Sequence, residues 1–228
     1  MSDRKWALLI VGKSFAMIFL LLGIVALAGH YQGRARTRRV HMVVSLREPW
    51  DDAVSWDREK GTQRKYRNPS SDPMGELIMG DSRTYYGMPD VRTYFRFHVG
   101  FPRDARVENA YLLLRCSASG QTQPKLSIAM IERDSFRLNH VPWSLPLSRI
   151  RVGWKYDTAD WKWVKYGAYR TPDLATLIQN HIERHPDSQM IGFVIINRPE
   201  NHDAFKGIWS FDDKPGYAAK LIVVYSAP

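Results

Sequence analysis

Residues 94–116, YFRFHVGFPRDARVENAYLLLRC, contain the two segments that decide the fold class. In the first segment Phe95, Phe97 and Val99 fall on one face, which is the two-residue period of a β-strand. The opposite face carries Tyr94, Arg96 and His98, and we expect it to meet solvent. The second segment, Ala110–Cys116, is apolar on both faces, as expected for a strand inside a sandwich.

Short runs of the same kind recur along the chain, separated by turn residues. They are Lys125–Ile131, Met190–Ile196, Ile208–Phe211 and Lys220–Tyr225, whereas Val40–Leu46 is expected as one short strand within the polar arm that precedes residue 76. Several short strands within one domain predict an all-β sandwich. We expect its two sheets to enclose one core formed by Phe95, Phe97, Leu112, Leu114, Phe193, Ile195, Leu221 and Val223.

One amphipathic helix interrupts the strands. Thr171 is placed as its N-cap, Pro172 as its first helical residue and Asp173 in the first turn, and Pro186 ends it. Apolar positions follow the spacing of a helix packed on a sheet, at Leu174, Leu177, Ile178, His181 and Ile182.

The order of these elements resembles a known family between Asp81 and Tyr225. The motifs are TYYG (84–87), the stretch 95–115, Val141–Trp143, TPDLATLIQNHI (171–182), MIGFVII (190–196) and WSFDDKPGYAAKLIVVY (209–225). Together they resemble the DNRLRE-type carbohydrate-binding-module-like domain. The resemblance implies a jelly-roll β-sandwich with one short crossover helix, a fold that serves in related proteins as an adaptor.

A hydrophobic segment precedes the domain. Residues 6–29, WALLIVGKSFAMIFLLLGIVALAG, would form a helix of roughly 36 Å, enough to cross a bilayer. A cleavable secretory signal is the alternative, because the segment has a basic start and the small-residue triplet Ala26–Ala28. We expect a transmembrane anchor at 1–29, a basic, polar arm at 30–75 and the sandwich at 76–228.

The charges flanking the anchor leave its orientation open. Four arginines follow it, Arg34, Arg36, Arg38 and Arg39, and they outnumber Arg4 and Lys5 before it, which favours a cytoplasmic domain. Long domains are translocated despite such charge, and the domain type favours the periplasmic side of a bacterial inner membrane. The net charge of +10 at pH 7 favours anionic partners.

Aromatic residues are concentrated in WKYDTADWKWVKYGAY, residues 154–169, where they alternate with lysines. Such residues anchor protein interfaces, stack on sugars or nucleic-acid bases, or sit at lipid head groups, and the alternative is that they simply pack inward. We take as candidate partner-binding residues the four arginines of the arm together with Trp154, Trp161, Trp163 and Tyr166.

Motifs for catalysis are missing from the sequence. There is no nucleophile elbow, phosphate loop or CxxC pair, and Cys116 lies in an apolar strand where a buried, inert thiol is expected. His181 and His185 have metal-compatible spacing but no third ligand. Turn carboxylates at Asp81, Asp90, Asp212 and Asp213 leave a structural Ca²⁺ open, and otherwise we expect no cofactor and no metal.

These observations predict a non-catalytic accessory subunit of a bacterial membrane complex, such as a bioenergetic or photosynthetic reaction-centre assembly. The expected partners are membrane lipid and other membrane-protein subunits, and not nucleic acid. Two alternatives stay open at this point. One is a membrane-tethered glycan-binding module, and the other is a glycan hydrolase that uses carboxylates distant in the chain.

Overall fold

The computed structural model describes residues 38–48, 51–56, 64–66, 76–87, 90–119, 123–133, 135–136, 138, 145–154 and 163–228. A compact unit covers Arg39–Ala227. The predicted membrane helix at 6–29 lies outside the described residues, and within them no helix combines the length and the apolar character that crossing a membrane requires.

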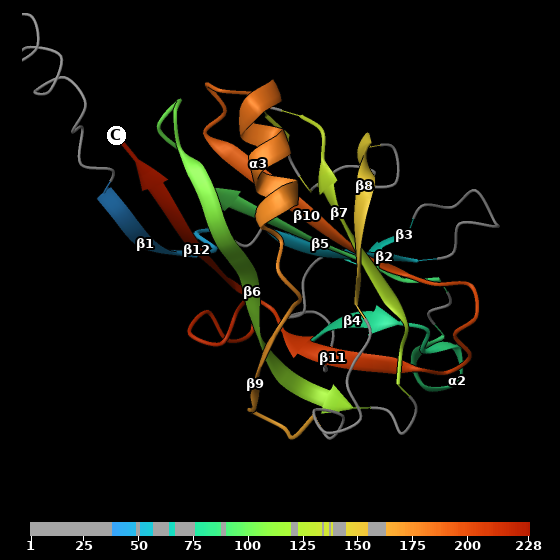
Figure 1. The fold of residues 1–228 in the computed structure, drawn as a ribbon. Helices are drawn as coiled ribbons and strands as arrows, with labels where there is room; N and C mark the ends of the chain where they lie inside the picture. Colours follow the sequence, from blue (N-terminus) through green and yellow to red (C-terminus); the bar gives the residue numbers. More distant parts are fainter. Residues whose placement is uncertain are drawn as a thin grey trace, which may run out of the picture. The chain divides into compact units, whose positions relative to one another are not determined.

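The unit is built from two antiparallel sheets, which confirms the predicted all-β sandwich (Figure 1). The first sheet has the order β1 (Arg38–Ser45), β12 (Lys220–Ala227), β6 (Arg106–Ser119), β11 (Phe205–Trp209) and β4 (Glu76–Gly80), and β9 (Ala168–Arg170) also pairs with β6. The second has the order β3 (Arg64–Tyr66), β2 (Asp52–Trp56), β5 (Arg92–His98), β10 (Met190–Asn197), β7 (Leu126–Ile131) and β8 (Leu147–Trp154).

Part of the polar arm belongs to this sandwich. Strand β1 forms one end of the first sheet, and β2 pairs with β5 in the second. The Asp52 carboxyl group on β2 accepts a hydrogen bond of 2.8 Å from the backbone N–H of Phe211, which follows β11. This bond joins the two sheets. Since β1 and β2 are strands of these sheets, residues 39–48 and 51–56 belong to the folded domain.

The main core lies between the sheets and contains all eight residues predicted for it, so that prediction is confirmed. Phe97 of β5 and Phe193 of β10 lie at its centre, edge to face at 6.3 Å between ring centroids. The prediction of a solvated second face on β5 is wrong, because Tyr94 and Arg96 are buried. A smaller cluster covers that face and includes Phe136, Leu138 and Leu145.

The predicted helix is present but begins later than expected. Helix α3 spans Ala175–Arg184, and Leu174 rather than Thr171 occupies its N-cap position. The Thr171 hydroxyl instead accepts a hydrogen bond from the N–H of Leu112, and Thr171 also donates its own N–H to the Leu112 carbonyl. Residues 171–174 therefore extend the contact with β6, while the Asp173 carboxylate accepts from the N–H of Ala175. The helix ends just before Pro186 and buries the predicted apolar positions, including His181.

The two helices of the described residues occupy different places in the fold. Helix α2 (Arg83–Tyr86) follows β4, and helix α3 contacts β6, β7 and β8 (Figure 1).

Candidate functional site

An exposed group of aromatic and cationic side chains lies where the turn before β9 meets the loop after β11. We call it the Tyr166 patch; its members are Arg115, Lys165, Tyr166, Trp209, Lys214 and Tyr217. The Tyr166 ring stacks on Trp209 with a centroid distance of 5.7 Å and an angle of 13°. Tyr217 meets Tyr166 edge-on at 5.8 Å.

Three cations lie against these rings. The Lys214 Nζ is 4.3 Å from the Trp209 centroid and 5.0 Å from that of Tyr166. The Lys165 Nζ lies 5.7 Å from the Tyr166 centroid, and the Arg115 guanidinium lies 5.2 Å from that of Tyr217. Each such contact contributes about 0.5–1 kcal/mol at an exposed site. None of the three cations forms an ion pair with a carboxylate of the described residues, so the patch is positively charged.

The turn that carries Tyr166 is fixed to β6 by its backbone. Tyr166 donates its N–H to the Cys116 carbonyl at 2.7 Å, and Gly167 accepts from the N–H of Cys116 at 2.9 Å. The Arg115 guanidinium also donates to the Tyr166 carbonyl at 3.1 Å. Tyr166 itself has φ 71°, the left-handed region that is rare outside glycine. These bonds hold a strained backbone in place.

The exposed aromatic rings of the patch are those of its two tyrosines. Tyr166 is 46% exposed and Tyr217 36%, whereas Trp209 beneath them is 7% exposed. Val164, two residues before Tyr166, is a further exposed apolar side chain. Because apolar rings are presented beside unneutralised cations on a fixed backbone, the arrangement suits an aromatic anchor against an anionic surface.

Two of the predicted partner-binding tryptophans lie beneath the surface. Trp154 and Trp163 are both buried, with ring centroids 6.1 Å apart, and Trp163 stacks on Tyr169 at 4.3 Å. The Tyr169 hydroxyl accepts from the N–H of Val164 at 2.6 Å. These residues follow the inward-packing alternative and support the turn, and only Tyr166 of the described aromatic candidates is exposed.

The arginine candidates lie elsewhere. Arg34 and Arg36, like Trp161, fall outside the described residues. Arg38 and Arg39 begin β1, and Arg39 pairs with Glu108 at 2.8 Å near the start of β6. The patch lies at the opposite end of β6, around Arg115, so the structure does not bring Arg39 and Tyr166 together.

One group of side chains in the described part of the chain has the composition of a metal site: Glu48, Asp51 and His98, with ligand atoms within 4.8 Å of one another. Arg96, a cation of the protein, already pairs with both carboxylates of the group. The Arg96 Nε lies 2.6 Å from Asp51 Oδ1, and an Arg96 Nη atom lies 3.3 Å from Glu48. Asp51 is also contacted by His98 Nε2 at 3.3 Å. The group is therefore best explained as an ion-pair network around the buried Asp51 and Arg96.

The carboxylates considered for Ca²⁺ belong to no such group in the described part of the chain. Asp81 is buried and accepts hydrogen bonds from the backbone and the guanidinium of Arg83, and Asp213 donates its N–H to Ser210 in the turn after β11. Cys116 is buried as predicted, and burial raises the pKa of its thiol to about 11, which keeps it protonated at neutral pH.

Sequence reasoning did not identify Trp209, Lys214 and Tyr217 as site residues. They lie in the motif WSFDDKPGY, which was noted only for its resemblance and its turn chemistry. A usable signal was present, since this loop repeats the aromatic–lysine–aromatic composition of the segment around Tyr166. Comparison of the sequence with protein-family models and with curated proteins finds no match.

Proposed function

We propose that this chain is a non-catalytic accessory subunit of a bacterial membrane complex, such as a bioenergetic assembly, anchored in the inner membrane by residues 6–29. In this proposal the periplasmic sandwich, with the jelly-roll connectivity of the DNRLRE-type domain, binds a partner subunit through the Tyr166 patch. The observation that carries the proposal is the patch itself, which combines two exposed tyrosines with three unneutralised cations.

The chemistry of the patch favours a protein partner with acidic groups. Tyrosine and arginine are enriched at the centres of protein interfaces, where a few anchors supply most of the binding free energy. Unpaired cations around such anchors favour acidic groups on the partner and speed association. Because the turn carrying Tyr166 is already fixed to β6, little conformational entropy is lost on binding.

Mild detergent extraction of the full-length protein from its native membranes tests the proposal. We expect the wild-type chain to co-purify with integral-membrane subunits, and the double variant Tyr166→Ala, Tyr217→Ala to lose them. Loss of an interface anchor typically costs about 2 kcal/mol or more, roughly a 30-fold weaker affinity. A second variant, Lys214→Glu, should weaken the same association by introducing repulsion.

The matched control is Tyr111→Ala. Tyr111 lies on the same strand as Arg115 but outside the patch, with the Arg170 guanidinium 4.7 Å from its ring centroid. It should leave the assembly intact, with folding of all variants checked by circular dichroism. Assembly that survives the double variant would refute the proposed role of the patch. Binding of the wild type to cell-wall glycans, lost in the double variant, would support a tethered glycan-binding module in its place.

A further inference from the structure

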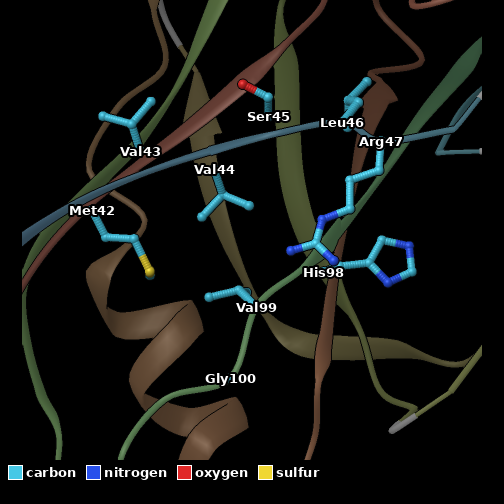
Figure 2. Close-up of a pocket in the computed structure, with 9 residues that line it drawn as sticks. All are labelled: Met42, Val43, Val44, Ser45, Leu46, Arg47, His98, Val99 and Gly100. Atoms are coloured by element: carbon cyan, nitrogen blue, oxygen red, sulfur yellow. The ribbon is translucent and has the colours of Figure 1, made fainter.

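The free edges of the two sheets differ in their charge. Along β1, which ends the first sheet, a groove of about 540 Å³ is lined by residues 42–47 and 98–100 (Figure 2). The two arginines of this region, Arg47 and Arg96, are matched by two carboxylates, those of Glu48 and Asp51. The groove therefore selects no ligand by its charge. The edge of the second sheet at β8 is different, because its cations are not balanced.

Strand β8 ends the second sheet beside β7 (Figure 1) and presents exposed arginines. Arg151 lies opposite Ala129 of β7, and Ala129 belongs to the smaller cluster, which lies on the face turned away from the main core. Because residues opposite each other in an antiparallel pair share a face, Arg151 lies on that face as well. The register shifts before Arg151, and at this irregularity Arg149 and Ile150 are both exposed.

A third arginine reaches this face from another element. Arg198 follows β10, and the strand order places β7 between β10 and β8. Gly153 leaves space for it, since a Cβ there would lie 3.0 Å from an Nη atom of Arg198. Arg198 donates its backbone N–H to the Lys125 carbonyl at 3.2 Å, and the Asn201 amide bonds both the N–H and the C=O of Lys125. A turn fixed to β7 thus directs the Arg198 guanidinium onto β8, two residues from Arg151.

Cations outnumber acidic side chains around Gly153. Strands β7, β8 and β10 contain no aspartate or glutamate, and residues 135–154 contain three arginines and no acidic residue. Glu200 is the acidic residue closest in sequence to Arg198, and it forms no ion pair with a described residue. Glu132, at the other end of β7, is bound by Arg184 at 2.7 Å. Residues 155–162, outside the described residues, add two lysines and two aspartates, so they leave the balance unchanged.

This surface suits the phosphate groups of a membrane. A guanidinium binds phosphate through paired hydrogen bonds, which makes arginine a common phosphate ligand. The arginines lie along an open edge, which suits a surface that carries many such groups. The exposed large apolar side chain of β8 is Ile150, 42% exposed between two arginines, whereas its aromatic residue Trp154 is buried. An aliphatic side chain flanked by cations fits the head-group region better than an interface that needs an aromatic anchor.

We propose that Arg149, Arg151 and Arg198 bind the phosphate groups of anionic phospholipids and hold the β8 edge of the sandwich against the membrane surface. This inference rests on the membrane anchor of the proposed function, which keeps a bilayer within reach, but not on the Tyr166 patch. Charged side chains on an edge strand also discourage pairing with other chains. That role does not require Arg198, which lies outside the edge strand.

Hydrogen exchange of the full-length protein in nanodiscs tests the proposal. One set of discs contains phosphatidylcholine alone, and the other contains equal amounts of phosphatidylcholine and phosphatidylglycerol. Each arginine at an anionic surface favours docking by about fivefold, so two together favour it by roughly 30-fold. We expect the β8 amides that face away from β7 to exchange at least about tenfold more slowly in the discs with phosphatidylglycerol. Amides of the loop 212–217 should exchange equally in both.

Variants separate these arginines from the general positive charge of the protein. Arg151→Gln, Arg198→Gln should lose the difference between the two lipids, with folding checked by circular dichroism. The matched control is Arg106→Gln, which removes an exposed cation from β6 in the other sheet and should keep the difference. Equal β8 exchange of the wild type in both lipids, or a difference that survives the double variant, would overturn the proposal. Slowing by an added polyglutamate peptide but not by phosphatidylglycerol would also overturn it and assign the surface to an acidic protein.

A failure of the anchor is distinguishable from a failure of this inference. A chain that stays soluble without detergent and does not enter nanodiscs would contradict the anchor of the proposed function. Liposomes of the same two compositions then test the arginines directly. Co-sedimentation with the liposomes that contain phosphatidylglycerol, weakened roughly 30-fold in the double variant, would support the inference. No co-sedimentation, or equal co-sedimentation with both compositions, would overturn it.

Discussion

Replacing Asp52 with asparagine should change how the stability of the domain depends on pH. Asp52 is buried, and burial raises the pKa of its carboxyl from 3.8 to about 8, with further increases from the charges of Asp212 and Asp51. Between these two values the folded protein keeps a proton that the unfolded chain releases. The folded state is therefore destabilised as pH rises from about 4 to about 8.

The size of the effect follows from the binding of one proton. Each pH unit within this window lowers the free energy of unfolding by about 1.4 kcal/mol, so the change from pH 5 to pH 7 contributes about 3 kcal/mol. For a domain of this size that corresponds to a decrease in Tm of about 5–10 °C. An asparagine at this position carries no titrating proton, while its side-chain oxygen can still accept the Phe211 N–H, so the variant should lack this contribution.

Thermal unfolding followed by circular dichroism at pH 5, 6 and 7 measures the difference between wild type and Asp52→Asn. The control is Asp104→Asn, which removes an exposed carboxyl group from the turn after β5 and keeps Asp52, so its Tm should fall with pH as that of the wild type does. The reasoning would be refuted if Asp52→Asn and the wild type gave parallel curves. A Tm that fell more steeply with pH in Asp52→Asn than in the wild type would refute it as well.

Three further substitutions test the packing. Phe97→Ala should lower the free energy of unfolding by about 3–5 kcal/mol, because the ring is fully buried between the sheets; an unchanged urea midpoint would mean that its face is wrongly assigned. Gly192→Ala places a Cβ 2.3 Å from the Phe136 ring, so we expect a loss of about 1–3 kcal/mol, with recovery in a Gly192→Ala, Phe136→Leu double variant. Arg96→Ala leaves Asp51 buried without its main cation and should cost about 3–5 kcal/mol in the same urea assay, whereas a cost below about 1 kcal/mol would contradict the proposed network.

The sandwich and its core were predictable because they depend on local alternation. Phe95 and Phe97 share one face of β5 by the two-residue period alone, and every residue predicted for the core lies in it. The opposite face was misjudged for a physical reason. The side chains that pack in one cluster with Tyr94 include Phe136 and Leu145. They come from a stretch of sequence in which polar and apolar residues do not alternate regularly, so no pattern predicted their contact with this face.

The contacts between buried polar groups could not be predicted from the sequence either. Asp51 and Arg96 are 45 residues apart, and Asp52 and Phe211 are 159 apart, so nothing local indicates that these groups meet. For the same reason residues 51–56, which begin with two aspartates, were assigned to a polar arm although they form a strand of the second sheet.

The candidate site was predictable only in part. Tyr166 was found from the aromatic composition of its segment, but composition does not distinguish an exposed ring from the buried Trp154 and Trp163. Tyr166 is exposed because it lies in a turn that is hydrogen-bonded to the backbone of β6. The ring partners of Tyr166, Trp209 and Tyr217, come from the end of β11 and the loop after it, more than forty residues away, and this pairing requires the sheet order of the folded protein.

Photo-crosslinking from the patch in intact membranes tests the central claim most directly. A photoreactive amino acid replaces Tyr217 in the full-length chain, and a second protein carries it at Tyr111 as the control site. We predict that irradiation links position 217, and not position 111, to one defined integral-membrane subunit identified by mass spectrometry. Equal crosslinking from both positions, or crosslinks from position 217 to glycan alone, would contradict the account of this chain as a subunit that binds its complex through the Tyr166 patch.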